Sequence, residues 1–233
     1  MSIRLAGKGT VPEGHYKTIK SKGSVRLHGK VKCVSFSASG ASKGDNIDCT
    51  KTFKALGRTT FSENIKAANI NVCGKLSCYG ALEADETISL HGNSKCKNQL
   101  SCYQLSSVGI LKVGEDIKAK YIDVAGAVHC KGLMSARNIQ IESDRVMNIG
   151  SIECNNITIK RKRISPRIKR RVIVDSVIEG DNITLSYVTC KKVIGKNVTI
   201  GKGCKIDVVQ YEYGFKASKK SNIWKIEKTQ FVK

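Results

Sequence analysis

Regularly spaced glycines constrain the fold of this chain more than any other feature. They recur at intervals of 17, 17, 17, 18, 17 and 17 residues, and Ser143 takes the next place in the series. The glycines are Gly23, Gly40, Gly57, Gly74, Gly92, Gly109 and Gly126. A fixed period of this length is typical of solenoid proteins, in which each repeat can bury its apolar residues only by stacking on its neighbours.

Each repeat contains short pairs of apolar residues two positions apart. In the repeat that begins at Gly109 these pairs are Leu111 with Val113, Ile117 with Ala119, and Ile122 with Val124. Residues two apart in a strand point to the same face, so each pair predicts a short strand with one buried face. Three strands and three bends in about 17 residues predict an all-β fold, namely a single-stranded β-helix of triangular cross-section with turns about 4.8 Å apart.

Two columns of equivalent positions support this register. About ten residues after each start the sequence has only Ala or Cys, and thirteen to fourteen residues after it only Phe, Ile or Leu. The small column suits a tight interior corner, where a larger side chain would overpack. The small residues are Cys33, Cys49, Ala67, Ala84, Cys102, Ala119, Ala136 and Cys154. The same register predicts that Val113, Ile117 and Ile122 are buried and that Lys112, Lys118 and Lys120 are exposed.

Breaks in the periodicity divide the chain into five segments. We expect a partial capping coil over residues 1–22, repeat coils over 23–160, a basic loop over 161–171, further coils over 172–211 and a terminal cap over 212–233. The basic loop contains seven Lys or Arg residues and no acidic residue. Its Pro166 argues against an interior strand, because proline cannot donate a hydrogen bond to a neighbouring strand.

No cofactor or metal site is expected from the sequence. The ten cysteines include no Cys-x-x-Cys pair, and most of them fall at inward positions of the repeat, where a free thiol packs as a small hydrophobic group. No Gly-x-x-x-x-Gly-Lys-Ser/Thr motif for binding phosphates occurs either. We therefore expect the cysteines to serve packing.

The chain is strongly basic, with a net charge of +22. This balance favours anionic partners, namely nucleic acid, acidic lipid or an acidic protein surface, although surface lysines also keep a long β-solenoid soluble and discourage edge pairing. The sequence contains no apolar run of signal-peptide or membrane-span length. We expect a cytoplasmic protein, with the inner face of the membrane as a site of association.

Two sets of residues are candidate interaction sites. The basic loop is the candidate for docking a partner or a membrane, because the repeat does not need it to fill the core. Its basic residues are Arg161, Lys162, Arg163, Arg167, Lys169, Arg170 and Arg171. The ends of an uncapped β-helix expose unpaired strand edges, so apolar residues near the termini are candidates for self-association. These are Leu5, Tyr16, Phe215 and Trp224.

The repeat also resembles a known family. The pattern Gly-x-[Val/Leu]-x-[Val/Cys]-x-x-x-[Ile/Val/Leu]-x-[Ala/Cys], with the closing segment from Ile200 to Cys204, is similar to the bactofilins. Within that family it resembles the polymer-forming cytoskeletal proteins of Gram-positive, Bacillus- or Clostridium-like bacteria. The resemblance covers most of the chain. It implies a right-handed β-helix that polymerises end to end without nucleotide and scaffolds proteins for cell shape, envelope, motility or chromosome positioning.

Three functions follow from these patterns. The favoured one is a non-enzymatic scaffold that forms a homopolymer or homo-oligomer and binds acidic proteins or an anionic membrane. The alternative is a basic module for nucleic acid or anionic membrane, without sequence-specific reading because the basic loop has no aromatic residue. The third is a hexapeptide-type acyltransferase, suggested by Val193-Ile-Gly and Thr199-Ile-Gly. It is disfavoured because the repeat orients no partner for the candidate general bases, which are His15, His28, His91 and His129.

The basic loop gives a direct test of docking. Replacing its seven basic residues with Ser should leave folding and self-assembly intact, because the loop is not needed to fill the core. Binding to anionic vesicles or an acidic protein should weaken and lose much of its salt dependence, since each Lys or Arg near an anionic membrane contributes about 1 kcal/mol. Vesicle sedimentation at several salt concentrations measures this. Parent-like binding by the Ser variant would make the loop a spacer.

Overall fold

A computed structural model describes residues 1–143, 145–161 and 172–230. These residues form an all-β solenoid of parallel strands and no helix, as the sequence predicts. Successive turns lie about 17 residues apart, as the pairing of Gly40 with Gly57 and of Gly57 with Gly74 shows. The chain forms two compact units, Met1–Glu115 and Asp116–Lys233.

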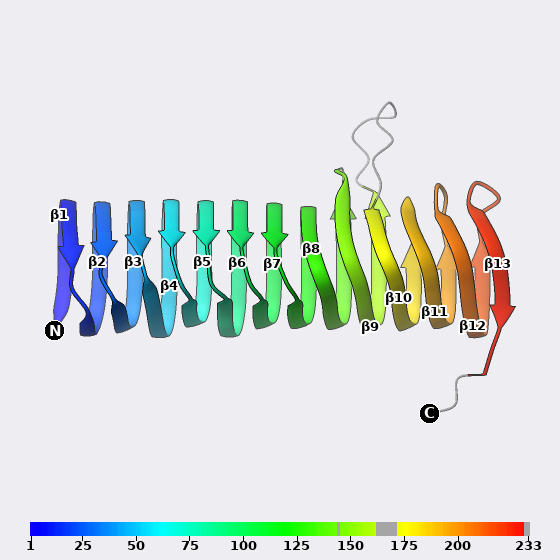
Figure 1. Ribbon diagram of the computed structural model, residues 1–233, viewed down its shortest axis with the longest axis horizontal. Coiled ribbons are helices and arrows are strands. Elements are labelled where there is room, and N and C mark those ends of the chain that lie inside the picture. Colours follow the sequence, from blue (N-terminus) through cyan, green and yellow to red (C-terminus); the bar gives the residue numbers. More distant parts are fainter. Residues whose placement is uncertain (144, 162–171, 231–233) are drawn as a thin grey trace. The chain divides into compact units, whose positions relative to one another are not determined.

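The first unit contains seven strands, each of which bends within its length. Every strand pairs in parallel with the next strand in the sequence, so chain order and spatial order agree within the unit (Figure 1). The strands are β1 (Ser2–Val11), β2 (Gly14–Leu27), β3 (Lys30–Gly44), β4 (Asn46–Phe61), β5 (Ile65–Cys78), β6 (Leu82–Cys96) and β7 (Leu100–Val113).

The second unit contains six strands with the same parallel, sequential pairing. The long strand β8 extends over 27 residues. Residues 162–171, which include most of the expected basic loop, come between β9 and β10 and lie outside the described ranges. The strands are β8 (Ile117–Ser143), β9 (Met147–Arg161), β10 (Val172–Leu185), β11 (Val188–Ile200), β12 (Lys205–Ala217) and β13 (Asn222–Lys228).

Equivalent side chains of successive turns stack on one another in the core. Phe36 pairs with Phe53 and Phe53 with Ile70, and the rings of Phe36 and Phe53 are stacked with centroids 5.0 Å apart. The small column is equally in register, since Cys33 pairs with Cys49 and Cys49 with Ala67. Both columns confirm the predicted register.

The burial of the repeat that begins at Gly109 also agrees with the sequence. Val113, Ile117 and Ile122 are buried. Lys112, Lys118 and Lys120, which alternate with inward residues, are exposed. The period of two therefore separates core from surface correctly in this repeat.

Three expected segment boundaries fall inside strands and need correction. Arg161, the expected start of the basic loop, is the last residue of β9. The expected end of the capping coil, residue 22, lies within β2, and Gly7 pairs with Gly23 in the same register as the later glycines. The expected start of the terminal cap, residue 212, lies within β12, which continues to Ala217. The repeat register extends further in both directions because strand pairing persists where the sequence pattern becomes less regular.

The recurring glycines form one corner of the turns in the first unit. From Gly23 to Gly109 their φ angles lie between 110° and 121°, a region that side chains with a Cβ atom rarely adopt. A Cβ atom on Gly57 would lie 2.3 Å from the carbonyl oxygen of Gly40, and one on Gly74 would lie 2.3 Å from that of Gly57. Each glycine thus lets two turns approach closely at this corner.

This close approach predicts a difference between two glycine substitutions. Gly7→Ala places a Cβ where nothing lies within 4 Å, so only its φ of 88° costs free energy, of the order of 1–3 kcal/mol. Gly57→Ala meets the same conformational cost and also the Gly40 carbonyl. Thermal and chemical unfolding should show a clearly larger loss of stability for Gly57→Ala. Equal losses in the two variants would contradict the stacked corner.

Candidate interaction surfaces

The first turn exposes the end of the apolar core. Leu5 on β1 faces inward above Ser21, and Tyr16 on β2 lies in register with Cys33. Both side chains are half-buried, because no described strand stacks on their outer side. The Tyr16 hydroxyl donates a hydrogen bond to the Pro12 carbonyl oxygen at 2.9 Å, which holds the ring at this end. The two candidate residues therefore lie where the inward columns of the first unit begin.

The last turns end core columns of the second unit. Phe215 on β12 lies in register with the buried Val198 and is itself half-buried. Its ring stacks on that of Tyr211 with centroids 5.3 Å apart. The final strand β13 pairs with β12, and no other described strand pairs with it. Phe215 thus belongs to the core column, as expected of a residue near an end.

Trp224 has a different environment from Phe215. Its neighbour Ile223 pairs with the buried Ile206 and faces inward, so Trp224 faces outward from β13. The Trp224 side chain is 86% exposed, and Tyr213 on β12 is 68% exposed. Trp224 therefore offers an apolar surface on the side of the last turn rather than an extension of the core.

Only one residue of the candidate docking loop can be placed. Lys162, Arg163, Arg167, Lys169, Arg170 and Arg171 lie outside the described residues. Arg161 ends β9, and its guanidinium carbon lies 5.0 Å from the centre of the Tyr187 ring. A guanidinium at this distance from an aromatic ring is attracted by the ring's electrons. Arg161 is thus anchored to the bend between β10 and β11, where Tyr187 adopts a φ of 58°.

An asparagine ladder lines one corner of the second unit. The side-chain amide of Asn156 donates to Asn138 at 2.7 Å, that of Asn182 to Asn156 at 2.8 Å, and that of Asn197 to Asn182 at 2.9 Å. The ladder gives each amide a partner in the next turn and so supports the register of this unit.

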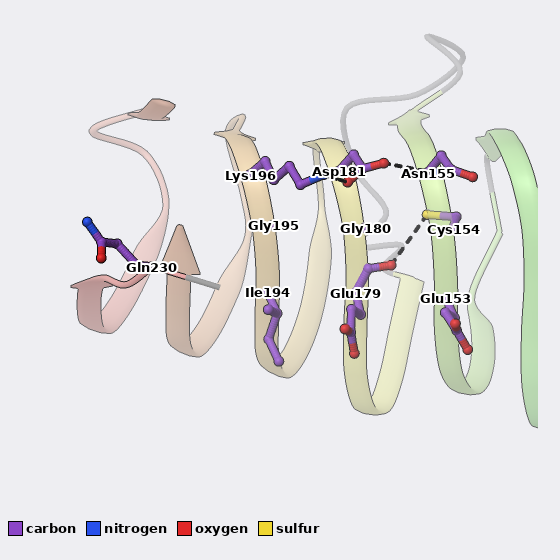
Figure 2. A pocket seen from close by; sticks show the side chains of 10 residues that line it. All are labelled: Glu153, Cys154, Asn155, Glu179, Gly180, Asp181, Ile194, Gly195, Lys196 and Gln230. Carbon is purple, nitrogen blue, oxygen red and sulfur yellow. Dashed lines mark hydrogen bonds and ion pairs between the residues drawn. The ribbon is translucent and has the colours of Figure 1, made fainter. Parts of the chain in front are cut away.

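A shallow polar groove of about 470 Å³ lies beside this ladder (Figure 2). The Lys196 ammonium lies 2.6 Å from one Asp181 oxygen, and the Asn155 amide donates to the other at 2.8 Å. The hydrogen bond to Asp181 raises the pKa of Lys196, so this ammonium stays charged. Asp181 thus joins three successive turns, and its two oxygens already have partners. The arrangement is a bridge between turns rather than an activated nucleophile or base.

Sequence reasoning did not find this groove. Asn155 and Asp181 each precede an asparagine of the ladder, but 26 residues separate them, so the basic insertion hides their equivalence. The shared position before a ladder asparagine is the signal that could have found them.

The histidines do not gather at one site. His15, His28 and His91 are exposed and belong to different turns, and His129 is half-buried on β8. Within the described residues, no group of three or more His, Cys, Asp or Glu side chains is placed to hold a metal ion. The four candidate general bases thus remain separate polar residues.

Burial keeps four of the cysteine thiols in their protonated form. Burial raises the pKa of Cys102 and of Cys154 to about 12, and that of Cys130 and of Cys190 to about 11. A protonated, enclosed thiol is a poor nucleophile and metal ligand. This favours the packing role that the sequence predicts for these four residues.

The comparisons with known proteins give one partial match. No family model matches the chain, and no solved structure matches it. An uncharacterized protein of Bacillus subtilis (strain 168), YhbF, is 34% identical over 83 residues. The match covers 35% of this chain, and the chain spans 35% of the length of YhbF. No helix in the described ranges is long and apolar enough to cross a membrane.

Proposed function

We propose that this protein is a non-enzymatic scaffold, similar to the bactofilins, that assembles end to end without nucleotide and positions partner proteins. The observation that carries the proposal is the incomplete strand pairing of the two terminal turns. Among the described strands, β1 and β13 each have a paired neighbour on one side only, and half-buried apolar residues lie beside both of them.

The physical driving force is the completion of strand pairing and core stacking. An unpaired strand edge presents a row of free backbone donors and acceptors that a second chain can satisfy. Leu5 and Ile3 begin inward columns of the first unit, and Phe215 and Ile223 end inward columns of the second unit. A second copy stacked on either terminal turn would remove these side chains from water. Burial of apolar surface contributes roughly 25 cal/mol per Å².

The scaffold proposal requires no chemistry from the described side chains. Lys196 and Asp181, the charged pair in the polar groove, already bind each other. Desolvation raises the pKa of the Cys102 and Cys154 thiols to about 12 and that of the Cys130 and Cys190 thiols to about 11. These features support a structural role over acyl transfer, for which a histidine base with an orienting partner would be needed.

Purified protein should form filaments or higher oligomers in buffer that contains chelator and no nucleotide. Leu5→Lys and Ile223→Lys should each reduce assembly strongly, because a charge at an inward end position opposes stacking of another turn. Thr10→Lys and Asn222→Lys are matched controls, since each adds the same charge at an exposed position of β1 or β13. Negative-stain microscopy and analytical ultracentrifugation measure the outcome.

Two results would contradict this proposal. A protein that stays strictly monomeric at high concentration in ordinary salt would contradict end-to-end assembly. Equal loss of assembly in the end variants and in their exposed controls would show that added charge, rather than the core columns, controls association. Melting temperatures of all four variants identify any that fail to fold.

A further inference from the structure

The positive charge of the coils is concentrated in the first four turns. Residues 1–58 contain 12 basic and 3 acidic residues, a net charge of +9. Residues 59–160 contain 11 basic and 10 acidic residues, a net charge of +1. General solubility does not require such a contrast between neighbouring stretches of one repeat. The first stretch therefore has a surface property that the next lacks.

The structure gathers most of these charges around the glycine corner. Arg4 pairs with Lys20 on one side of the corner, and Arg26 with Lys43 on the other, so like charges stand side by side on adjacent turns. All the basic residues of this surface are exposed. Most of the other residues that stack in register with them on these turns are Ser, Thr or Ala. The basic corner surface comprises Arg4, Lys8, Lys20, Lys22, Arg26, Lys43, Lys54 and Arg58.

Of the three acidic residues of this stretch, only Asp45 lies at the edge of the surface, where it lines a groove with Arg26 and Lys43. Glu13 precedes β2, Asp45 lies between β3 and β4, and Asp48 lies between the buried Ile47 and Cys49. Like charges on adjacent turns are about 4.8 Å apart and repel each other. A row of anions that lies across several turns would relieve this repulsion.

One edge of the surface is hollowed into a groove of about 340 Å³. Arg26, Lys43 and His28 line it together with Tyr79, whose side chain is 53% exposed. Its carboxylate, Asp45, accepts hydrogen bonds from the Gly29 amide and the Ser62 hydroxyl, both at 2.9 Å. The groove thus places an exposed aromatic ring beside cationic groups, which the basic loop cannot do because it has no aromatic residue.

We propose that the basic corner surface binds the phosphate backbone of single-stranded nucleic acid without sequence preference, with a base stacked on Tyr79. Cations that follow a backbone beside an aromatic ring are the usual elements of such binding. A planar membrane fits the geometry less well, because the charges occupy two faces that meet at a corner. Leu56, which precedes the corner glycine Gly57, is 40% exposed. The inference does not depend on assembly.

Binding of a fluorescent 20-residue oligothymidylate, measured by anisotropy at several salt concentrations, tests the surface. The variant Lys20→Gln, Arg26→Gln, Lys43→Gln should bind at least about tenfold more weakly and lower the salt slope by about 2, because each lost phosphate contact removes about 0.7 for single strands. The control variant Lys66→Gln, Lys97→Gln, Lys118→Gln removes the same charge from exposed positions of later turns. It should keep nearly the parent slope.

A second pair of variants tests the stacking of a base on Tyr79. Tyr79→Ala should weaken oligothymidylate binding about fivefold or more without changing the salt slope, because stacking involves no phosphate contact. Tyr103→Ala, at another exposed tyrosine on β7, should bind like the parent.

Equal losses in the two charge variants would overturn the proposal and assign binding to net charge alone. Binding to phosphatidylserine vesicles but not to the oligonucleotide, lost in the first variant, would overturn it in favour of a membrane surface.

Discussion

The contact that the coil depends on is the approach of each corner glycine to the carbonyl oxygen of the glycine one turn before. A Cβ atom on Gly57 would lie only 2.3 Å from the carbonyl oxygen of Gly40. Parallel strands about 4.8 Å apart leave no room for a side chain where the backbone turns inward with positive φ. Glycine at this position therefore permits the turn, and the interval between glycines sets the length of the turns in the first unit.

Once the turns are in register, the remaining side chains have little choice of position. Equivalent residues stack directly, which gives apolar columns such as Phe36 on Phe53 in the core. The same rule acts on the outside, where it puts Arg26 beside Lys43 and the amide of Asn182 beside that of Asn156. Amide columns satisfy themselves through hydrogen bonds, whereas cation columns gain from an anion. Stacking thus converts a repeated sequence into repeated surface chemistry.

Much of the fold could be predicted from the sequence because the period and the inward positions are local properties. The buried Val113 and the exposed Lys112 follow from alternation alone. The Asp181 bridge could not be predicted in this way, since it depends on the alignment of turns on either side of an insertion. The net charge of +22 does not predict the basic corner surface, because a single total conceals the contrast between the first 58 residues and the coils that follow.

The end surfaces were predictable in part. Leu5, Tyr16 and Phe215 lie on inward columns, as apolar residues near the ends of a solenoid should. The outward direction of Trp224 depends on the register of β13, which the irregular sequence after residue 211 does not reveal.

Disulfide mapping tests the register itself most directly. Ser37→Cys with Lys54→Cys joins register partners and should crosslink under mild oxidation, as adjacent parallel positions fall within disulfide range. Ser37→Cys with Leu56→Cys, two residues out of register, should not; preferential crosslinking of this second pair would contradict the 17-residue turn.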